Sequence, residues 1–452
     1  MPHTRHSRPV RFASALALLV GSTIAVRSAA GPDRSGQESS LAKPTPAQLA
    51  WQDHELGVFI HFAPNTWQDQ EADDLTTPLS EINPRALDTD EWVAAAKAMG
   101  AGYLVFTAKH VGGFCWWPTE TTEYSVKHVA WKNGEGDLMA DLAASCRRAG
   151  LGLGVYLSPA DRSQGVGVGG TADDPDRQAA YEAMYRTQLT ELLTNYGPIE
   201  EVWFDGSLVF DVGDILRRHA PRAMVFQGPQ ATIRWVGNEE GVCPPDSWNA
   251  VEYDETEWGR MTARHSSPRG DRWAPIECDA RLRDSWFWRT DNVDTIKSVD
   301  DLMAMYHASV GHGANLLLNL TPDRTGAIPS AEVERVAEFG AEIRRRYGRP
   351  LASTSGLGVV HEIALGGDAR FDAIILMEDL AFGERVRRWS IEAFVDGEWR
   401  PIAHGRAIGH KRIVRVDPIQ ATKARLRVSD AVGEPAIRGF SVYSTEPPPP
   451  SN

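Results

Sequence analysis

Carboxylates that directly follow apolar segments are the first residues in this sequence that could do chemistry. Asp205 ends the run Val202-Trp203-Phe204. Burying an acid beside aromatic residues costs free energy unless the acid is paired or used. A helix cap or a lysine partner would be a purely structural explanation, and we favour catalysis. A nucleophilic carboxylate with a second carboxyl group about 5–5.5 Å away is the arrangement of retaining glycosidases.

The second carboxylate has several candidates downstream of Asp205. Glu239 lies in a loop predicted to follow the fifth strand, where a mobile acid could reach a leaving group. Glu277 stands near another predicted strand end. Spacing alone does not choose between these two. The remaining candidates are Glu240, Asp246 and Asp279.

Polar and aromatic residues follow or lie in three further apolar runs that we predict to be strands. His61 follows the first run, Lys109-His110 and Trp116-Trp117 follow the second, and Tyr156 lies in the third. Active sites of parallel α/β barrels lie at the carboxyl ends of the strands. We therefore expect these side chains to share a rim with Asp205. For the second histidine and the tyrosine taken alone, a role in the core is an equal alternative.

The elements that must position these residues alternate along most of the chain. Predicted strands are 58–62, 103–108, 152–157, 201–204, 223–226 and 315–320, and predicted helices are 90–99, 138–149, 177–193, 300–310 and 331–346. This alternation predicts a TIM-like (β/α)8 barrel. A Rossmann fold is disfavoured because no glycine-rich turn follows the first strand.

The two ends of the chain carry different patterns. A basic start, an apolar stretch over 12–26 and small residues at 28–30 predict a signal peptide over 1–30, with an uncleaved anchor as the alternative. We therefore expect a secreted or periplasmic protein. Short alternating runs after the barrel predict a small C-terminal β-sandwich. The predicted parts are the signal peptide 1–30, a leader 31–50, the barrel 51–348, the sandwich 351–446 and a Pro-rich tail 447–452.

Composition limits the partners. The formal net charge of −14, without a basic stripe, excludes nucleic acid as an expected partner. After the N-terminal stretch no second apolar run could span a membrane. Barrel metallohydrolases often carry two histidines on the first strand, whereas only His61 is present here, so we expect neither a metal nor another cofactor. The four cysteines could form disulfides or remain free thiols, and the oligomeric state is left open.

Several segments together resemble glycoside hydrolase family 29, the α-L-fucosidases, and particularly the branch that acts on α-1,3- and α-1,4-linked fucose. The resemblance implies an exo-glycosidase that releases α-L-fucose or a closely related sugar from glycans by retaining double displacement. A catalytically inactive carbohydrate-binding protein on the same fold is the alternative. The matching segments are 57–62, 107–118, 154–162, 202–206, 234–241, 275–288 and 316–329 in the barrel and 378–386 and 408–413 beyond it.

The resemblance also implies roles for individual residues. Asp205 matches the nucleophile that follows Trp-Phe in the family. Glu239, at the end of a Gly-Asn-Glu motif, matches the acid/base of the branch. The residues that match sugar-binding or nearby positions are His61, Glu71, His110, Trp116 (or Trp117), Tyr156, Glu277 and Trp286.

Three motifs depart from the family pattern. The family's His-His-Asp-Gly-Phe is His-Val-Gly-Gly-Phe at 110–114, its Glu-Trp-Gly is Glu-Ala-Asp at 71–73, and its Ser-Pro-Trp-Asp-Arg is Ser-Pro-Ala-Asp-Arg at 158–162. In addition, Pro245 replaces a glutamate expected near Trp248. Both predicted catalytic carboxylates are retained. We therefore expect an intact mechanism with altered sugar discrimination, because a lost hydrogen-bonding pair can change discrimination by orders of magnitude.

Overall fold

The computed structural model describes residues 41–445. The predicted signal peptide and the Pro-rich tail lie outside these residues, as does the first half of the predicted leader. Within 41–445, no helix combines the length and apolar character that crossing a bilayer requires. All four cysteines are buried free thiols.

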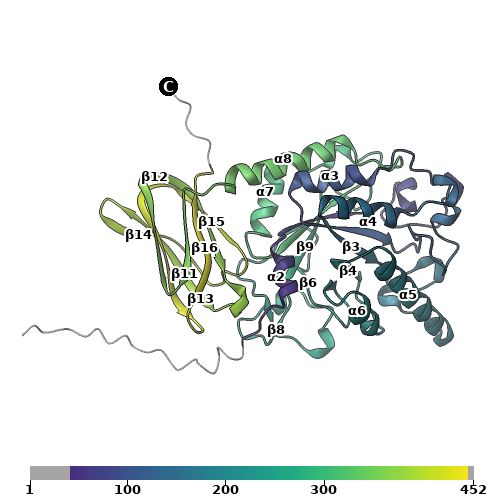
Figure 1. Ribbon diagram of the computed structural model, residues 1–452, viewed down its shortest axis with the longest axis horizontal. Coiled ribbons are helices and arrows are strands. Elements are labelled where there is room, and N and C mark those ends of the chain that lie inside the picture. The colour runs from purple at the N-terminus through teal and green to yellow at the C-terminus, as the bar shows by residue number, and fades with distance from the viewer. Residues whose placement is uncertain (1–40, 446–452) are drawn as a thin grey trace, which may run out of the picture. The chain divides into compact units, whose positions relative to one another are not determined.

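Eight parallel strands form the first sheet, in the order β5-β4-β3-β2-β1-β10-β9-β6 (Figure 1). A parallel bridge between Phe226 and Ile233 links the two edges, so the sheet closes into a barrel. This confirms the predicted TIM-like barrel. The strands are β1 (Leu56–Ile60), β2 (Tyr103–Lys109), β3 (Gly152–Leu157), β4 (Glu201–Trp203), β5 (Met224–Phe226), β6 (Arg234–Trp235), β9 (Ile276–Arg281) and β10 (Asn315–Leu320).

Helices cover most of the barrel. Asp88 and Asp137 cap the N-termini of α3 and α4 with their side chains, and Gly100 and Gly150 end these helices in the left-handed conformation. Helix α3 packs between α4 and α8 (Figure 1). The helices are α2 (Pro46–Gln52) before β1, and then α3 (Thr89–Met99), α4 (Leu138–Ala149), α5 (Pro175–Asn195), α6 (Gly213–His219), α7 (Val299–Ala308) and α8 (Ser330–Tyr347).

One side of the barrel departs from regular strand–helix repeats. Strands β5 and β6 are joined by the turn 227–233, which is too short to hold a crossover helix. The segment between β6 and β9 instead carries the short antiparallel strands β7 (Ala250–Val251) and β8 (Arg272–Trp273). The connection from β6 to β9 is therefore long, and it carries Glu239.

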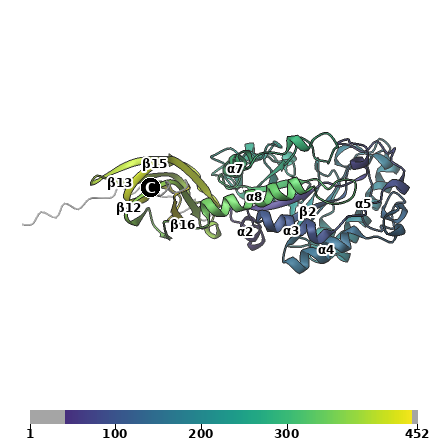
Figure 2. The ribbon, with the colours of Figure 1, turned by 90° about the horizontal axis from the view of Figure 1, so that it is seen from above.

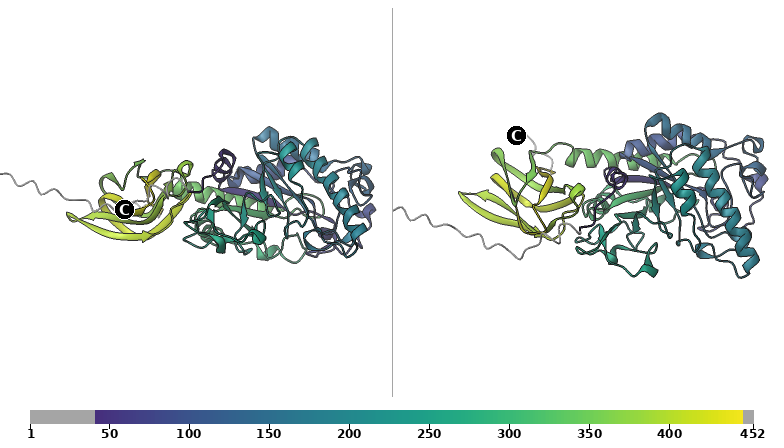
Figure 3. Two further views of the ribbon diagram at one scale, coloured as in Figure 1. Left: turned by 90° about the horizontal axis from the view of Figure 1, so that it is seen from below. Right: turned by 60° about the horizontal axis from the view of Figure 1, so that its bottom comes forward.

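The C-terminal region is an antiparallel β domain, as predicted. Its order is β11-β16-β12-β15-β13-β14. The pairing of β12 with β15 is interrupted by register breaks. The C-terminal half of β12 also pairs with β16, and the C-terminal half of β15 also pairs with β13. One apolar cluster, including Phe371, Trp389 and Phe440, draws on both halves. Figures 2 and 3 show these strands in yellow-green. Their bounds are β11 (Ala352–Leu357), β12 (Val360–Glu378), β13 (Val386–Val395), β14 (Glu398–Gly405), β15 (Arg412–Ala431) and β16 (Ala436–Tyr443).

Candidate active site

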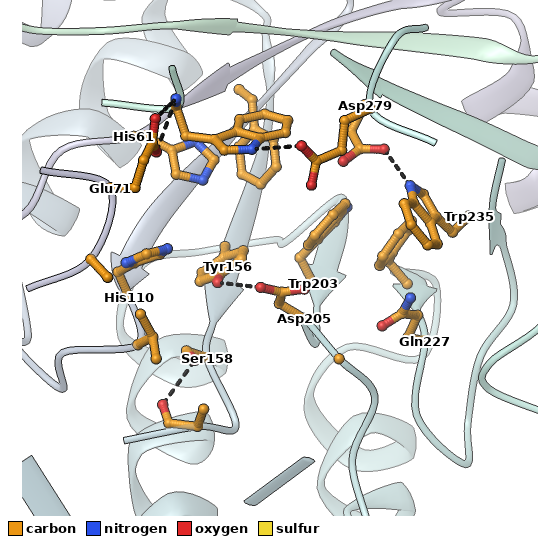
Figure 4. A pocket seen from close by; sticks show the side chains of 18 of the residues that line it. His61, Glu71, His110, Tyr156, Ser158, Trp203, Asp205, Gln227, Trp235 and Asp279 are labelled. Atoms are coloured by element: carbon orange, nitrogen blue, oxygen red, sulfur yellow. Dashed lines mark hydrogen bonds between the residues drawn. The ribbon is translucent and has the colours of Figure 1, made fainter. Parts of the chain in front are cut away.

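A pocket of about 540 Å³ lies at the carboxyl ends of the barrel strands (Figure 4). Most of the residues singled out from the sequence line it, from several different strands and loops. They are His61, Glu71, His110, Tyr156, Asp205, Glu239 and Trp286. Trp116 and Glu277 do not line this pocket.

Asp205 lies two residues after the end of β4 and is open to the pocket, although protein atoms enclose it on its other sides. The hydroxyl of Tyr156 donates a hydrogen bond to its Oδ2 at 3.0 Å (Figure 4). Desolvation raises the pKa of Asp205, the Tyr156 bond opposes this, and the charge of Glu239 raises it further. Gly206 follows with a φ of 72°, a left-handed conformation that suits glycine and turns the chain sharply.

Glu239 lies in the loop after β6, and 45% of its side chain is exposed. The indole Nε1 of Trp286 donates to Glu239 Oε2 at 3.2 Å. The main-chain N–H of Trp286 donates in turn to Glu71, at 3.0 and 3.2 Å to its two carboxylate oxygens. Arg281 adds a weak ion pair with Glu239 at 3.7 Å. The acid is thus oriented by its neighbours and still reaches solvent.

The two histidines of the pocket are neutral. Burial and the neighbouring His110 hold the pKa of His61 well below its usual value. Burial, together with the charge of Arg162, lowers the pKa of His110 to about 3. His61 Nδ1 lies 2.7 Å from Asn319 Oδ1, and Asn319 Nδ2 donates to the carbonyl of Trp286 at 2.8 Å. This orientation of the amide assigns the proton to His61 Nδ1 and leaves Nε2 as an acceptor.

Aromatic rings form the floor of the pocket. Trp203 stacks on Phe226 with ring centroids 3.6 Å apart and on Tyr156 at 5.7 Å. Phe59 packs against Trp203 edge-on at 5.0 Å. These rings give an apolar surface against which the apolar face of a sugar ring can pack.

Trp116 is a correction to the sequence interpretation. It is fully buried, stacks on Phe62 at 4.7 Å and donates from Nε1 to the carbonyl of Phe62 at 2.6 Å. Trp117 is buried as well and donates to Glu191 at 2.7 Å. The loop after β2 folds both indoles into the core, so neither contacts the pocket.

Glu277 is a second correction, because it lies inside the barrel beneath the pocket. It is fully buried and accepts hydrogen bonds from Tyr103 at 2.6 Å and from Trp203 at 2.8 Å. Burial and the charge of Glu277 raise the pKa of neighbouring Glu201 well above its usual value, so Glu201 holds a proton. The Glu277 carboxylate is linked to the pocket through its hydrogen bond from Trp203.

Asp279 also lines the pocket, and the sequence had named it only as one of several open candidates for the second carboxylate. Asp279 accepts a bond from Trp235 Nε1 at 2.6 Å (Figure 4), and burial raises the pKa of Asp279 well above its usual value. In β9, charged residues recur at every second position, 277, 279 and 281, and this period was the signal that could have revealed an inward-facing polar strand. Gln227, Trp235 and Arg281 also line the pocket and were not singled out from the sequence. Residues 41–445 contain no cluster of three metal-ligating side chains.

Comparisons with known protein sequences agree with this geometry. The chain matches the family model described as Alpha-L-fucosidase over residues 74–346. It is 34% identical to the putative alpha-L-fucosidase 1 of Oryza sativa subsp. japonica, over 89% of this chain and 85% of that protein. It is 30% identical to the alpha-L-fucosidase 1 of Arabidopsis thaliana, over 90% of each chain.

Solved structures give the same result. A putative alpha-L-fucosidase from Bacteroides thetaiotaomicron superposes with a TM-score of 0.84 and 34% identity, covering 90% of this chain and 100% of that chain. A family 29 fucosidase from Ruminococcus gnavus in complex with fucose gives a TM-score of 0.78 and 28% identity, covering 90% and 95%. The chain therefore belongs to the α-L-fucosidase family, glycoside hydrolase family 29.

Proposed function

We propose that this protein is an exo-acting α-L-fucosidase that releases α-L-fucose, or a closely related sugar, from glycans with retention of configuration. The observation that carries the proposal is that Asp205 and Glu239 line one pocket at the carboxyl ends of the barrel strands. One is held by Tyr156 and the other by Trp286. Two carboxyl groups with separate supports suit the two roles of a retaining glycosidase.

In the first step, a carboxylate oxygen of Asp205 attacks the anomeric carbon. The bond to the leaving oxygen breaks, and Glu239 gives that oxygen its proton. In the second step, Glu239 takes a proton from water, the water oxygen attacks the anomeric carbon, and the bond to Asp205 breaks. Two displacements at one carbon restore the original configuration.

Solvent access supports Glu239 over Glu277 as the acid/base. Glu239 is 45% exposed, so water and a leaving group can both reach it. Glu277 is fully buried, and its oxygens already accept bonds from Tyr103 and Trp203. A carboxyl group enclosed in this way cannot exchange a proton with the substrate without opening the barrel.

The linkage and the compartment belong to the same proposal. The Gly-Asn-Glu motif that ends at Glu239 resembles the branch that cleaves α-1,3- and α-1,4-linked fucose, and we propose these linkages for this protein. The basic and apolar segments within residues 1–30 support a secreted or periplasmic location. A glycan or oligosaccharide is the expected partner.

The test is hydrolysis of aryl α-L-fucosides, aryl α-L-galactosides and oligosaccharides with α-1,2-, α-1,3-, α-1,4- or α-1,6-linked fucose. The proposal expects release of fucose, fastest from the 1,3- and 1,4-linked compounds, and loss of release in Asp205→Ala. Binding of fucose without release from any compound would instead support the inactive carbohydrate-binding protein.

A further inference from the structure

Three small apolar side chains, those of Ala72, Val111 and Ala160, line the same pocket as the catalytic carboxylates. They come from three different loops. We call these three residues the apolar wall. The flanking residues His110 and Ser158 lie on one side of the pocket in Figure 4, away from Asp279 and Trp235.

The three loops that carry the apolar wall are hydrogen-bonded to one another. The main-chain N–H of Arg162 donates to the carbonyl of Val111 at 2.9 Å, and the N–H of Ser163 donates to the carbonyl of Gly112 at 3.3 Å. The guanidinium of Arg162 donates to the carbonyl of Asp73 at 2.9 Å. A single arginine therefore ties the loops that carry all three wall residues.

The three wall side chains themselves offer no hydrogen bond to a ligand. The hydroxyl of Ser158 already donates to the carbonyl of Ala160 at 2.8 Å. Val168, which is 72% exposed, extends the apolar surface of the pocket. Glu71 and His110 directly precede two of the wall residues in the chain and also line the pocket. Asp205, Glu239 and Arg281 belong to other strands and loops of the pocket.

The wall coincides with the departures from the family pattern. The resemblance to the family implies tryptophan, histidine and tryptophan at positions 72, 111 and 160, where this chain has alanine, valine and alanine. Every one of these changes removes a large or hydrogen-bonding side chain at the pocket surface. Their shared location indicates one altered surface rather than scattered substitutions.

A neighbouring exchange shows that the altered surface is structurally adjusted. The pattern has glycine at 73 and aspartate at 112, and this chain has Asp73 and Gly112. A Cβ atom on Gly112 would lie 2.6 Å from the Cβ of Asp73, so the Asp73 side chain fills the space that a residue at 112 would need. Asp73 is 1% exposed and accepts bonds from Gln68 at 2.8 Å and Tyr124 at 2.6 Å. The buried carboxylate is thus supplied from the other loop.

We propose that the apolar wall is a specificity-determining subsite for a fucose-type sugar in which the hydroxyl facing the wall carries a small apolar substituent, such as an O-methyl group. This inference rests on the proposed function. A free hydroxyl at the wall would leave water without gaining a partner. A methyl ether at the same oxygen has no donor to leave unpaired, and its methyl group gains by burial.

The experiment measures kcat/KM for 4-nitrophenyl α-L-fucoside and for its derivatives methylated singly at O2, O3 or O4. One methylated derivative is expected to be hydrolysed about tenfold better than the parent compound, the size of effect that one methyl group has in a shaped pocket. Val111→His and Ala72→Trp should each reverse that preference. Ala179→Trp, on the exposed surface of α5, is the matched control and should leave it unchanged.

Two failures are distinguishable. Hydrolysis of the parent fucoside with a more than tenfold loss for every methylated derivative would overturn the subsite and leave the proposed function standing. If no fucoside is hydrolysed, the proposed function fails, and calorimetric binding of fucose and the three O-methyl fucoses then decides the subsite. Tighter binding of one methylated sugar supports it, and equal or weaker binding of all three overturns it.

Thermal melting shows whether each variant is folded. If Ala72→Trp does not fold, Val111→His still provides the test.

Discussion

The indole N–H of Trp286 donates a hydrogen bond to the carboxylate of Glu239 at 3.2 Å, and the main-chain N–H of the same residue donates one to Glu71. A residue on the loop after β1 thereby orients an acid on the loop after β6, with one tryptophan between them. This link explains how an exposed glutamate on a long loop can keep a fixed direction toward the pocket.

Trp286→Phe removes the indole donor while keeping an aromatic ring. We expect kcat/KM to fall about 10- to 100-fold for an oligosaccharide, because misdirected general-acid catalysis costs part of its usual 10²–10⁴-fold contribution. The loss should be smaller for 4-nitrophenyl α-L-fucoside, whose leaving group needs little protonation. Trp258→Phe, outside this pocket, is the control. Equal losses on both substrates would contradict a role through Glu239.

Tyr156→Phe removes the hydroxyl that donates to Asp205. Because this bond lowers the pKa of Asp205, its loss should raise that pKa and move the acid limb of the kcat/KM profile to higher pH. Glu239→Gln removes a charge that raises the same pKa, so its acid limb should move to lower pH. The measurement is the pH dependence of kcat/KM for an activated aryl fucoside. If the acid limb of either variant shifts in the opposite direction, the assignment of Asp205 as the ionised group is refuted.

Much of the barrel could be predicted from sequence because its central strands are continuous apolar runs. β3 and β10 have the predicted bounds, and all of β10 is buried. β6 was missed because it has only the residues Arg234 and Trp235. β9 was predicted only as a strand end near Glu277, because its alternating charges face the barrel interior and give no apolar run. Polar strands in an enzyme barrel do not give the apolar signal on which strand prediction depends.

Site residues at the end of a strand could be predicted from the sequence. Residues further along a loop were harder to predict, because the path of the loop determines where their side chains point. His61 directly follows β1 and Asp205 stands two residues after β4, and both lie in the pocket. Trp116 lies beyond the end of β2, where the loop turns it back against Phe62. Glu277 lies near the start of β9 rather than at its end, which places it beneath the pocket. Position along the strand, and not residue type, separates these cases.

The exchange between positions 73 and 112 predicts a non-additive pair of substitutions. Gly112→Asp should lower the free energy of unfolding by about 1–3 kcal/mol, the usual cost of overpacking, because its side chain meets Asp73. Asp73→Gly alone should also destabilise, since Gln68 and Tyr124 lose an acceptor. The double variant should be more stable than the sum of the two changes. Urea unfolding of all four proteins measures this, and simple additivity would contradict it.

Glu201→Gln tests the buried carboxyl pair. The pKa of Glu201 is raised in the folded state, so its neutral form contributes fully to stability below pH 4.5, the ordinary pKa of a glutamate. This contribution is lost as the pH rises toward the folded-state pKa. Glutamine stays neutral in both states. The variant should therefore gain stability relative to the wild type as the pH rises above about 4.5 in urea unfolding. The exposed Glu334→Gln is the control. If the difference in unfolding free energy between Glu201→Gln and the wild type does not change with pH, the raised pKa of Glu201 is contradicted.

The most direct test of the account is azide rescue of Asp205→Ala with an aryl α-L-fucoside, with the anomeric configuration of the product read by NMR. Loss of the nucleophile should lower turnover by about 10³-fold or more. Azide should then restore it by attacking from the vacated face, giving β-L-fucosyl azide. Glu239→Ala, in which the glycosyl-enzyme still forms, should instead give the α-azide. Near-normal turnover in Asp205→Ala, or an α-azide from that variant, would show that Asp205 is not the nucleophile.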